Sequence, residues 1–253
     1  MKVPKVIVLG DACVDQYVFG QCIKLNPESG APLLSMQNME KKFGMALNVK
    51  DNLKALGLDV DSIVPKEKSV KTRYIDTRTG QQLLRLDQDV KAEPLIIENI
   101  SGLNHYDAVI ISDYDKGFIS EDLLKAINQQ VNTYVFVDTK KTDLAQYENL
   151  IFKINQLELK KLSIPPKKLI VTLGKQGAWY NQKTYSTVDY PVVDVCGAGD
   201  MFLSMLVYGI VIGKTVDQSI DLANRAAGIS VMHQGVYVLS PNDVRSLLGD
   251  SLI

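Results

Sequence analysis

The sequence predicts an α/β fold in which a mainly parallel sheet carries helices on both faces. The main observation is that, from about residue 95 onward, short apolar runs alternate with stretches of helical pattern. The second observation is composition, because 46% of the 253 residues are hydrophobic and 23% are charged, as in an ordinary globular protein. A chain of this length can bury one core and carry a small appendage, so we expect residues 1–253 to form a single domain.

The predicted elements follow the apolar runs in chain order. Residues 5–10 form an apolar run that ends at Gly10, which indicates a buried first strand. Residues 70–75 and 81–87 are extended segments on either side of Thr79 and Gly80, a spacing typical of a β-hairpin. Later strands are expected over residues 107–112, 134–138, 150–154, 168–174 and 177–180. Helices are expected to end at Leu56, to cover 123–130 and 201–212, and to run from 223 to near 235.

Charge and cysteine content exclude several functional classes. The net charge of −1 gives no bulk attraction to nucleic acid or membranes, and the basic clusters at 66–73 and 160–168 are interpreted as solvated faces. The longest apolar run, residues 201–212, is too short to span a bilayer. Three cysteines form no even disulfide framework, and two histidines without a Cys-x-x-Cys provide no zinc or iron ligand set. We therefore expect a cytoplasmic protein without nucleic-acid or membrane partners.

The segment 197–200 gives the strongest functional signal. Gly197, Ala198 and Gly199 precede Asp200 and the apolar run 201–212, which predicts a tight turn that leads into a buried helix. The backbone amides of such a turn and the positive end of the helix dipole together favour an anion such as phosphate. Beside that phosphate, the useful role of Asp200 is to accept the proton of an attacking hydroxyl. Taken alone, the pattern also fits an ordinary helix start with an acidic first turn.

The stretch 194–200 resembles the Asp-x-x-Gly-Ala-Gly-Asp signature of the ribokinase-like (PfkB) sugar kinases, and companion motifs follow the family's order along most of the chain. Within that family it looks most similar to kinases that phosphorylate a heptose 7-phosphate at its anomeric position. The resemblance implies a ribokinase-like, doubly wound sheet with a small β-sheet lid formed by residues 16–43 and 70–88. It implies ATP, Mg²⁺ and a sugar as ligands, and it allows a monovalent cation such as K⁺.

The resemblance also matches residues to substrate-binding positions. Asp15 stands where the family's second aspartate binds sugar hydroxyls, although a carboxylate capping the next turn is the alternative. Met45 replaces the second glycine of the family's Gly-Gly-Ala-x-Asn, which puts substrate size and lid motion in question. The basic residues of the hairpin are expected to bind a substrate phosphate, or else to be ordinary cross-strand charges. The substrate set is Asp15, Gly44, Asn48, Lys71, Arg73, Arg85, Asp113 and Lys116.

A second set of residues is matched to the nucleotide. Asn155 and Glu158 fit the family's Asn-x-x-Glu, which organises a hydrated Mg²⁺ ion, and their spacing also fits a helix capping box. Both can be true together. For Lys140, as for Lys116, a solvent-facing role is the alternative, and for the element with Thr172 and Gly174 the alternative is a plain hairpin turn. The nucleotide set is Asp138, Lys140, Asn155, Thr172, Gly174, Gly177, Asp194 and Asn224.

The chain departs from the family pattern after Gly57, where only residues 58–69 precede the hairpin and about one βα unit is missing. We expect the sheet to lose an edge strand and part of the groove wall, or a partner chain to supply the cover, as in a homodimer. The chain contains no His-x-Gly-His, so no nucleotidyltransferase half is expected. The alternatives are a non-catalytic nucleotide- or sugar-binding protein, against which the intact Asp200 argues, and a kinase for another sugar or a nucleoside.

Overall fold

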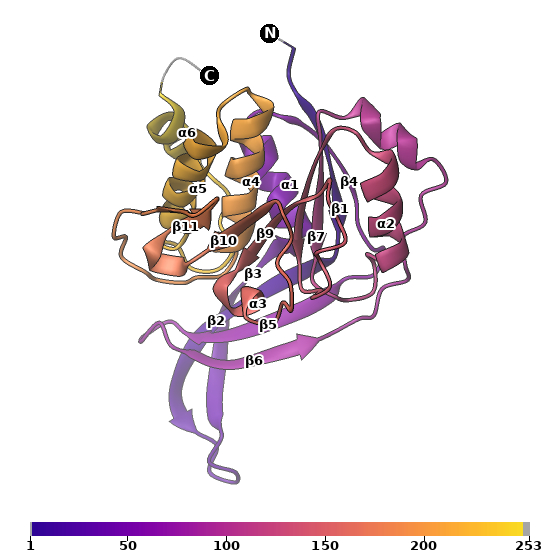
Figure 1. Cartoon of the computed structure of the whole chain (residues 1–253). Helices are drawn as coiled ribbons and strands as arrows, with labels where there is room; N and C mark the ends of the chain where they lie inside the picture. The colour runs from indigo at the N-terminus through magenta and orange to yellow at the C-terminus, as the bar shows by residue number, and fades with distance from the viewer. Residues whose placement is uncertain (1, 250–253) are drawn as a thin grey trace.

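The computed structural model describes residues 2–249, which form two β-sheets and a set of helices (Figure 1). The large sheet has eight strands in the order β12-β11-β10-β9-β8-β7-β1-β4. Its first six strands in chain order are parallel, and β11 and β12 are antiparallel additions at one edge. The strands are β1 (Lys5–Gly10), β4 (Asp59–Ile63), β7 (Ala108–Asp113), β8 (Tyr134–Thr139), β9 (Ile151–Asn155), β10 (Leu169–Thr172), β11 (Ala178–Tyr180) and β12 (Lys183–Tyr185).

Helices cover both faces of this sheet, as the alternating sequence pattern predicts. One face packs against α1 (Ala46–Ala55), α4 (Ala198–Val211), α5 (Val216–Ser230) and α6 (Pro241–Leu248). The other face packs against η1 (Ile100–His105) and α2 (Glu121–Gln130). Within β7, Ile110 belongs to the first core and Val109 and Ile111 to the second, because successive side chains of a strand point to opposite faces.

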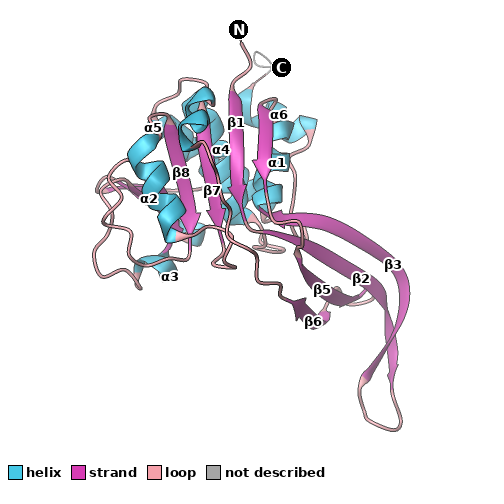
Figure 2. Cartoon of the chain, turned by 90° about the vertical axis from the view of Figure 1, so that its right-hand side faces the viewer, coloured by secondary structure: helices cyan, strands magenta, loops and turns pink. Residues whose placement is uncertain are grey.

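The small sheet has the order β3-β2-β5-β6, from β2 (Ala12–Leu25), β3 (Pro32–Met45), β5 (Ser69–Asp76) and β6 (Gln82–Gln88). Strand β2 pairs antiparallel with β3 and parallel with β5, and β5 and β6 form the predicted hairpin. Figure 2 shows this sheet projecting from the end of the large sheet at which β1, β7 and β8 finish. Ligands of open α/β sheets bind outside this carboxyl end, so the small sheet borders the expected crevice.

The structure tests two predictions about elements: the bounds of the helix predicted from residue 223, and the short connection after Gly57. Helix α5 begins at Val216 and ends at Ser230, so the predicted range of 223 to near 235 is wrong. The missed signal is a capping box, in which Thr215 and Gln218 satisfy each other's backbone amides. The short connection after Gly57 contains β4, which forms the edge of the large sheet beside β1. Residues 64–68 then lead directly into β5, so the described chain has no crossover helix at this point.

Candidate active site

The turn at residues 197–199 lies at the start of α4 and has the geometry that the sequence predicts. Gly197 is left-handed, with φ of 76°, and a Cβ there would lie 2.9 Å from Asn48 Nδ2 and 3.1 Å from Val236 Cγ1. Only glycine fits this conformation and this space without strain. Asp194 fastens the turn, since its carboxylate accepts hydrogen bonds from the backbone amides of Cys196 (3.0 Å) and Gly235 (2.9 Å).

Asp200 lies in the first turn of α4 and is 3% exposed. Its carboxylate accepts one hydrogen bond from Asn48 Nδ2 (3.0 Å) and one from the hydroxyl of Tyr114 (2.8 Å). Burial raises the pKa of Asp200 to about 6; the two hydrogen bonds oppose this shift, and the negative charge of Asp138 adds to it. A carboxylate that titrates close to neutral pH is suited to accept a proton in a reaction.

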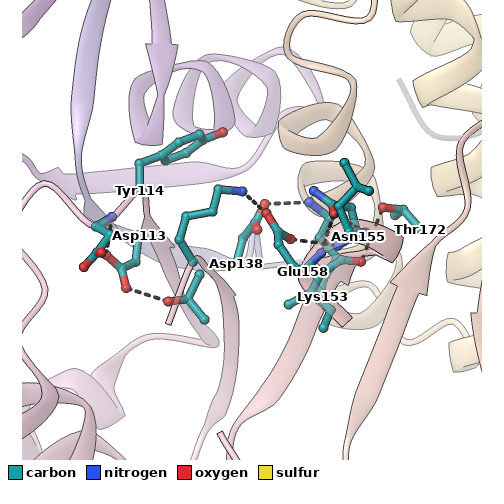
Figure 3. A network of polar contacts seen from close by, with 12 residues as sticks. Asp113, Tyr114, Asp138, Lys153, Asn155, Glu158 and Thr172 are labelled. Atoms are coloured by element: carbon teal, nitrogen blue, oxygen red, sulfur yellow. Dashed lines mark hydrogen bonds and ion pairs between the residues drawn. The ribbon is translucent and has the colours of Figure 1, made fainter. Parts of the chain in front are cut away.

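A buried ion pair lies beside Asp200 and was not predicted from the sequence. Lys153, in the middle of β9, donates to Asp138 at the end of β8 over 2.5 Å, and both side chains are almost fully buried (Figure 3). A Cβ on Gly199 would lie 3.0 Å from Lys153 Nζ, so the ammonium sits directly against the turn. The available signal was a lysine inside the otherwise apolar run 150–154, because a lysine is rarely buried unless it is paired.

Asn155 and Glu158 form the predicted capping box at α3 (Gln156–Leu159). Asn155 Oδ1 accepts from the amides of Leu157 and Glu158, and Glu158 Oε2 accepts from the amide of Asn155 (2.8 Å). Lys140 donates to Glu158 Oε1 and lies over the ring of Tyr114, at 5.1 Å from its centroid. The capping interpretation is therefore confirmed. The carboxylate and amide oxygens are hard donors of the kind that Mg²⁺ prefers, and their protein partners leave water-mediated binding as the form that fits.

A cavity of about 200 Å³ opens beside the turn and is lined by four of the eight predicted nucleotide residues. Gly228 forms part of its wall, and a Cβ there would collide with the ring of Tyr190, which also lines the cavity. The amide nitrogen of Asn224 donates a hydrogen bond to the carbonyl of Tyr185 (2.8 Å), so its amide oxygen is the part of the side chain that this bond leaves for a ligand. The sequence-predicted residues in the lining are Thr172, Gly174, Gly177, Ala198, Gly199 and Asn224.

The predicted substrate residues of the small sheet share one of its faces. The strand register sets Asp15 opposite Lys71 and Arg73 opposite Arg85. Arg73 donates to the buried carboxylate of Asp15 and also reaches Cys196 Sγ (3.8 Å), which links the sheet to the turn. Gly44 has no room for a side chain, since a Cβ would collide with Asp15.

Asp113 and Lys116 lie away from this face, Arg85 is paired with a neighbouring carboxylate, and Met45 departs from the family pattern. The carboxylate of Asp113 is fully buried on the α2 side of the sheet, where it accepts from Thr139 Oγ1 (2.6 Å) and pairs with Lys141 (3.1 Å). Lys116 pairs with Asp89 (2.8 Å) at the surface, and Arg85 pairs with Asp87 (2.5 Å). Met45 occupies the backbone conformation that glycine favours, with φ of 60°, and is buried just before α1.

The family model described as pfkB family carbohydrate kinase matches residues 45–243. This match covers well over half of the chain. The chain belongs to the PfkB family of carbohydrate kinases. This membership confirms the sugar-kinase class predicted from the sequence at the level of the family.

Curated relatives of this PfkB-family chain include the bifunctional protein HldE of a Nitratiruptor species, which is 30% identical over 95% of the chain. The HldE protein of Haemophilus influenzae (strain PittEE) is 30% identical over 98% of the chain. The chain spans 64% of the length of each of these relatives. The first alignment covers 297 positions against the 253 residues of the chain, so that relative carries segments which this chain lacks.

Solved structures share the ribokinase-like fold. A ribokinase from Thermotoga maritima matches with a TM-score of 0.72 and 16% identity, covering 98% of this chain and 99% of that chain. Arabidopsis thaliana ribokinase, solved with ribose and ATP, matches with a TM-score of 0.69 and 18% identity, covering 98% and 99% of the two chains. The predicted fold class is thereby confirmed. Among residues 2–249, no helix combines the length and the apolar character that crossing a membrane requires.

Proposed function

We propose that this PfkB-family chain is a kinase that transfers the γ-phosphoryl group of ATP to a hydroxyl of a sugar or sugar phosphate. The observation that carries the proposal is the placement of Asp200. Its buried carboxylate, with a pKa of about 6, follows directly on the glycine turn at the start of α4 and lies beside a cavity. A base and an anion-binding turn at one point are the two groups that phosphoryl transfer to a hydroxyl requires.

Different residues of the site accept the proton, hold the base in place and stabilise the transferred phosphoryl group. Asp200 accepts the proton of the attacking hydroxyl, and Asn48 and Tyr114 hold its carboxylate in place from two different elements. The amides of residues 197–199, together with the positive end of α4, receive the charge that develops on the transferred group. Positioning and charge neutralisation supply most of the rate in this type of reaction, so little covalent chemistry is asked of the protein.

The cavity beside the turn is proposed to bind the nucleotide. Its lining contains Thr172, Gly174, Gly177 and Asn224, four of the eight residues matched to the nucleotide in the sequence. Support comes from the solved Arabidopsis ribokinase, whose structure contains ribose and ATP. Asn155 and Glu158 would hold Mg²⁺ through water, and Mg²⁺ would neutralise phosphate charge there. A monovalent cation is a further proposal, supported by an Escherichia coli phosphofructokinase-2 structure solved in complex with potassium.

A heptose 7-phosphate is the acceptor that we favour. Support comes from the resemblance of the hairpin to the heptose kinase lid and from the curated HldE relatives. Lys71 and Arg73 lie on the face of the small sheet that carries Asp15, where they would meet a phosphorylated acceptor. We propose that this sheet, with residues 16–43 and 70–88, acts as the lid of a single domain.

A homodimer through the small sheet is also proposed. The strand register places Met39, Phe43, Leu84 and Leu86 on the face opposite to the one that carries Asp15. These four side chains are 45–57% exposed and lie on the two edge strands, β3 and β6. Exposed apolar side chains on one face of a sheet support an interaction site there. Light scattering coupled to gel filtration should give a mass twice that of the chain, and a monomer at micromolar concentration would overturn this proposal.

The cytoplasmic location expected from the three cysteines, which are all free, stays a prediction.

The decisive experiment measures ADP release with ATP and Mg²⁺ over a panel of free sugars, sugar phosphates and nucleosides. Asp200→Asn serves as the blank, and we expect it to lose on the order of 10²–10⁴-fold in turnover because the proton acceptor is gone. Turnover on a heptose phosphate alone would support the favoured acceptor, and turnover on another sugar would replace it. ATP binding without turnover on any acceptor would favour the non-catalytic alternative.

A further inference from the structure

Lys153 is a buried charge for which the proposed reaction steps give no role. It is 3% exposed and has one hydrogen-bond partner in the described structure, Asp138, although an ammonium group has three N–H donors. Its Nζ lies against Gly199, in the turn that precedes Asp200. A buried charge is costly unless its surroundings compensate it, and a surface position for this lysine would avoid that cost.

Two carboxylates meet at this end of the sheet. Asp138 is 4% exposed and Asp200 is 3% exposed, and the two repel each other strongly enough for Asp138 to disfavour the ionised form of Asp200. The groups nearest to Asp200 are Asn48 on α1, Tyr114 after β7, Asp138 on β8 and Lys153 on β9. The thiols of Cys13 and Cys196 also lie nearby, and burial raises the pKa of both. Lys140 is a second cation that interacts with Asp200, but it is partly exposed and paired with Glu158, so Lys153 is the buried cation of the group. An anionic substrate would add further negative charge.

We infer that Lys153 is a positioning residue: its ammonium, placed between Asp138 and the turn at Gly199, keeps Asp200 ionised and able to accept a proton. The inference rests on the proposed function, because it concerns the base of that reaction. Lys153 acts through charge at short range and transfers no proton itself. The pair forms because Lys153 and Asp138 lie on adjacent parallel strands and both side chains point to the face of the sheet that packs against α4.

The test is a cycle of Lys153→Met, Asp138→Asn and the double variant, read out as the pH at which Asp200 titrates. The first readout is ¹³C NMR of the full chain labelled at the aspartate side-chain carboxyls, with the Asp200 signal assigned by its loss in Asp200→Asn. We expect Lys153→Met to raise the midpoint by roughly one unit or more, since a nearby opposite charge lowers a carboxyl pKa by roughly 1–3 units. Asp138→Asn should lower it, and the double variant should return towards wild type.

The double variant keeps the inference testable if Lys153→Met alone does not fold, because removing one partner of a buried pair leaves an unpaired charge. The double variant should then titrate at higher pH than Asp138→Asn, and this difference isolates Lys153. Equal midpoints in that comparison would overturn the inference. Lys167→Met, at an exposed lysine paired with Glu148 (2.6 Å), is the matched control and should leave the midpoint unchanged.

The second readout is the acid limb of kcat/KM against pH, measured with an acceptor that the panel identifies. The limb should move in the same direction as the NMR midpoint in every variant. If the panel finds no acceptor, the proposed function fails while the NMR titration still decides the role of Lys153. Midpoints that shift while the limb stays fixed would show that Lys153 controls the charge of Asp200 without any effect on the rate, and would overturn its role in positioning the base.

Discussion

Replacement of Asp200 by asparagine is expected to change how the stability of the protein depends on pH. In the folded protein, burial raises the pKa of this carboxyl from 3.8 to about 6. The folded state therefore binds the proton more tightly than the unfolded chain does. Between these two pKa values the unfolded state releases its proton first, so the stability of the wild type falls as pH rises through this window.

The magnitude follows from the size of the pKa shift. Each pKa unit corresponds to about 1.36 kcal/mol, so a shift of about two units gives roughly 3 kcal/mol in total. Roughly 2 kcal/mol of this is lost between pH 4.5 and pH 7.5, because the lower end of the window lies below pH 4.5. The asparagine variant lacks this contribution. The free energy of unfolding of the wild type minus that of Asp200→Asn should therefore decrease by roughly 2 kcal/mol over this range, whatever constant offset the lost hydrogen bonds add.

Urea unfolding of both proteins, at half-unit steps between pH 4.5 and 7.5, measures this difference. Asp61→Asn is the control, because the pKa of Asp61 is lowered from 3.8 by its hydrogen bonds to Lys5 and Tyr106. Any pH dependence from Asp61 therefore lies below this range, and for that variant the difference should stay flat between pH 4.5 and 7.5. A difference for Asp200→Asn that is flat with pH, or that grows, would refute the conclusion that Asp200 is a buried carboxyl with a raised pKa.

Three further substitutions test the binding parts of the site. Gly44→Ala should displace the carboxylate of Asp15 and lower kcat/KM for the sugar on the order of 100-fold, with ATP affinity kept, as steady-state kinetics would show; equal losses for both ligands would contradict the assignment. Glu158→Gln should raise the Mg²⁺ concentration needed for half-maximal rate by roughly 10–100-fold, and an unchanged Mg²⁺ titration would remove Glu158 from the metal site. Gly228→Ala should push Tyr190 out of place and weaken ATP binding by roughly tenfold in calorimetry, whereas Gly102→Ala, far from the cavity, should not.

Features set by a few neighbouring residues could be predicted from the sequence. The glycine turn at 197–199 and the capping box of Asn155 and Glu158 depend on contacts within three or four positions, and both occur as predicted. The parallel sheet with helices on both faces follows from the alternation of apolar runs. The start of α5 was missed although its signal is equally local, because the apolar pattern near 223 outweighed the Thr215 cap.

The surroundings of Asp200 were decided by the tertiary structure. Asn48, Tyr114, Asp138 and Lys153 come from four separate elements and meet only when the parallel strands align their carboxyl ends. The same strand geometry points Asp138 towards α4 and buries Asp113 on the α2 side, because a shift of one residue along a strand reverses the face. By itself the sequence predicted the family, and it located the glycine turn and the carboxylate that we propose as the anion site and the base. The pKa of that base depends on burial and on charges far away in the chain, and those exist only in the folded molecule.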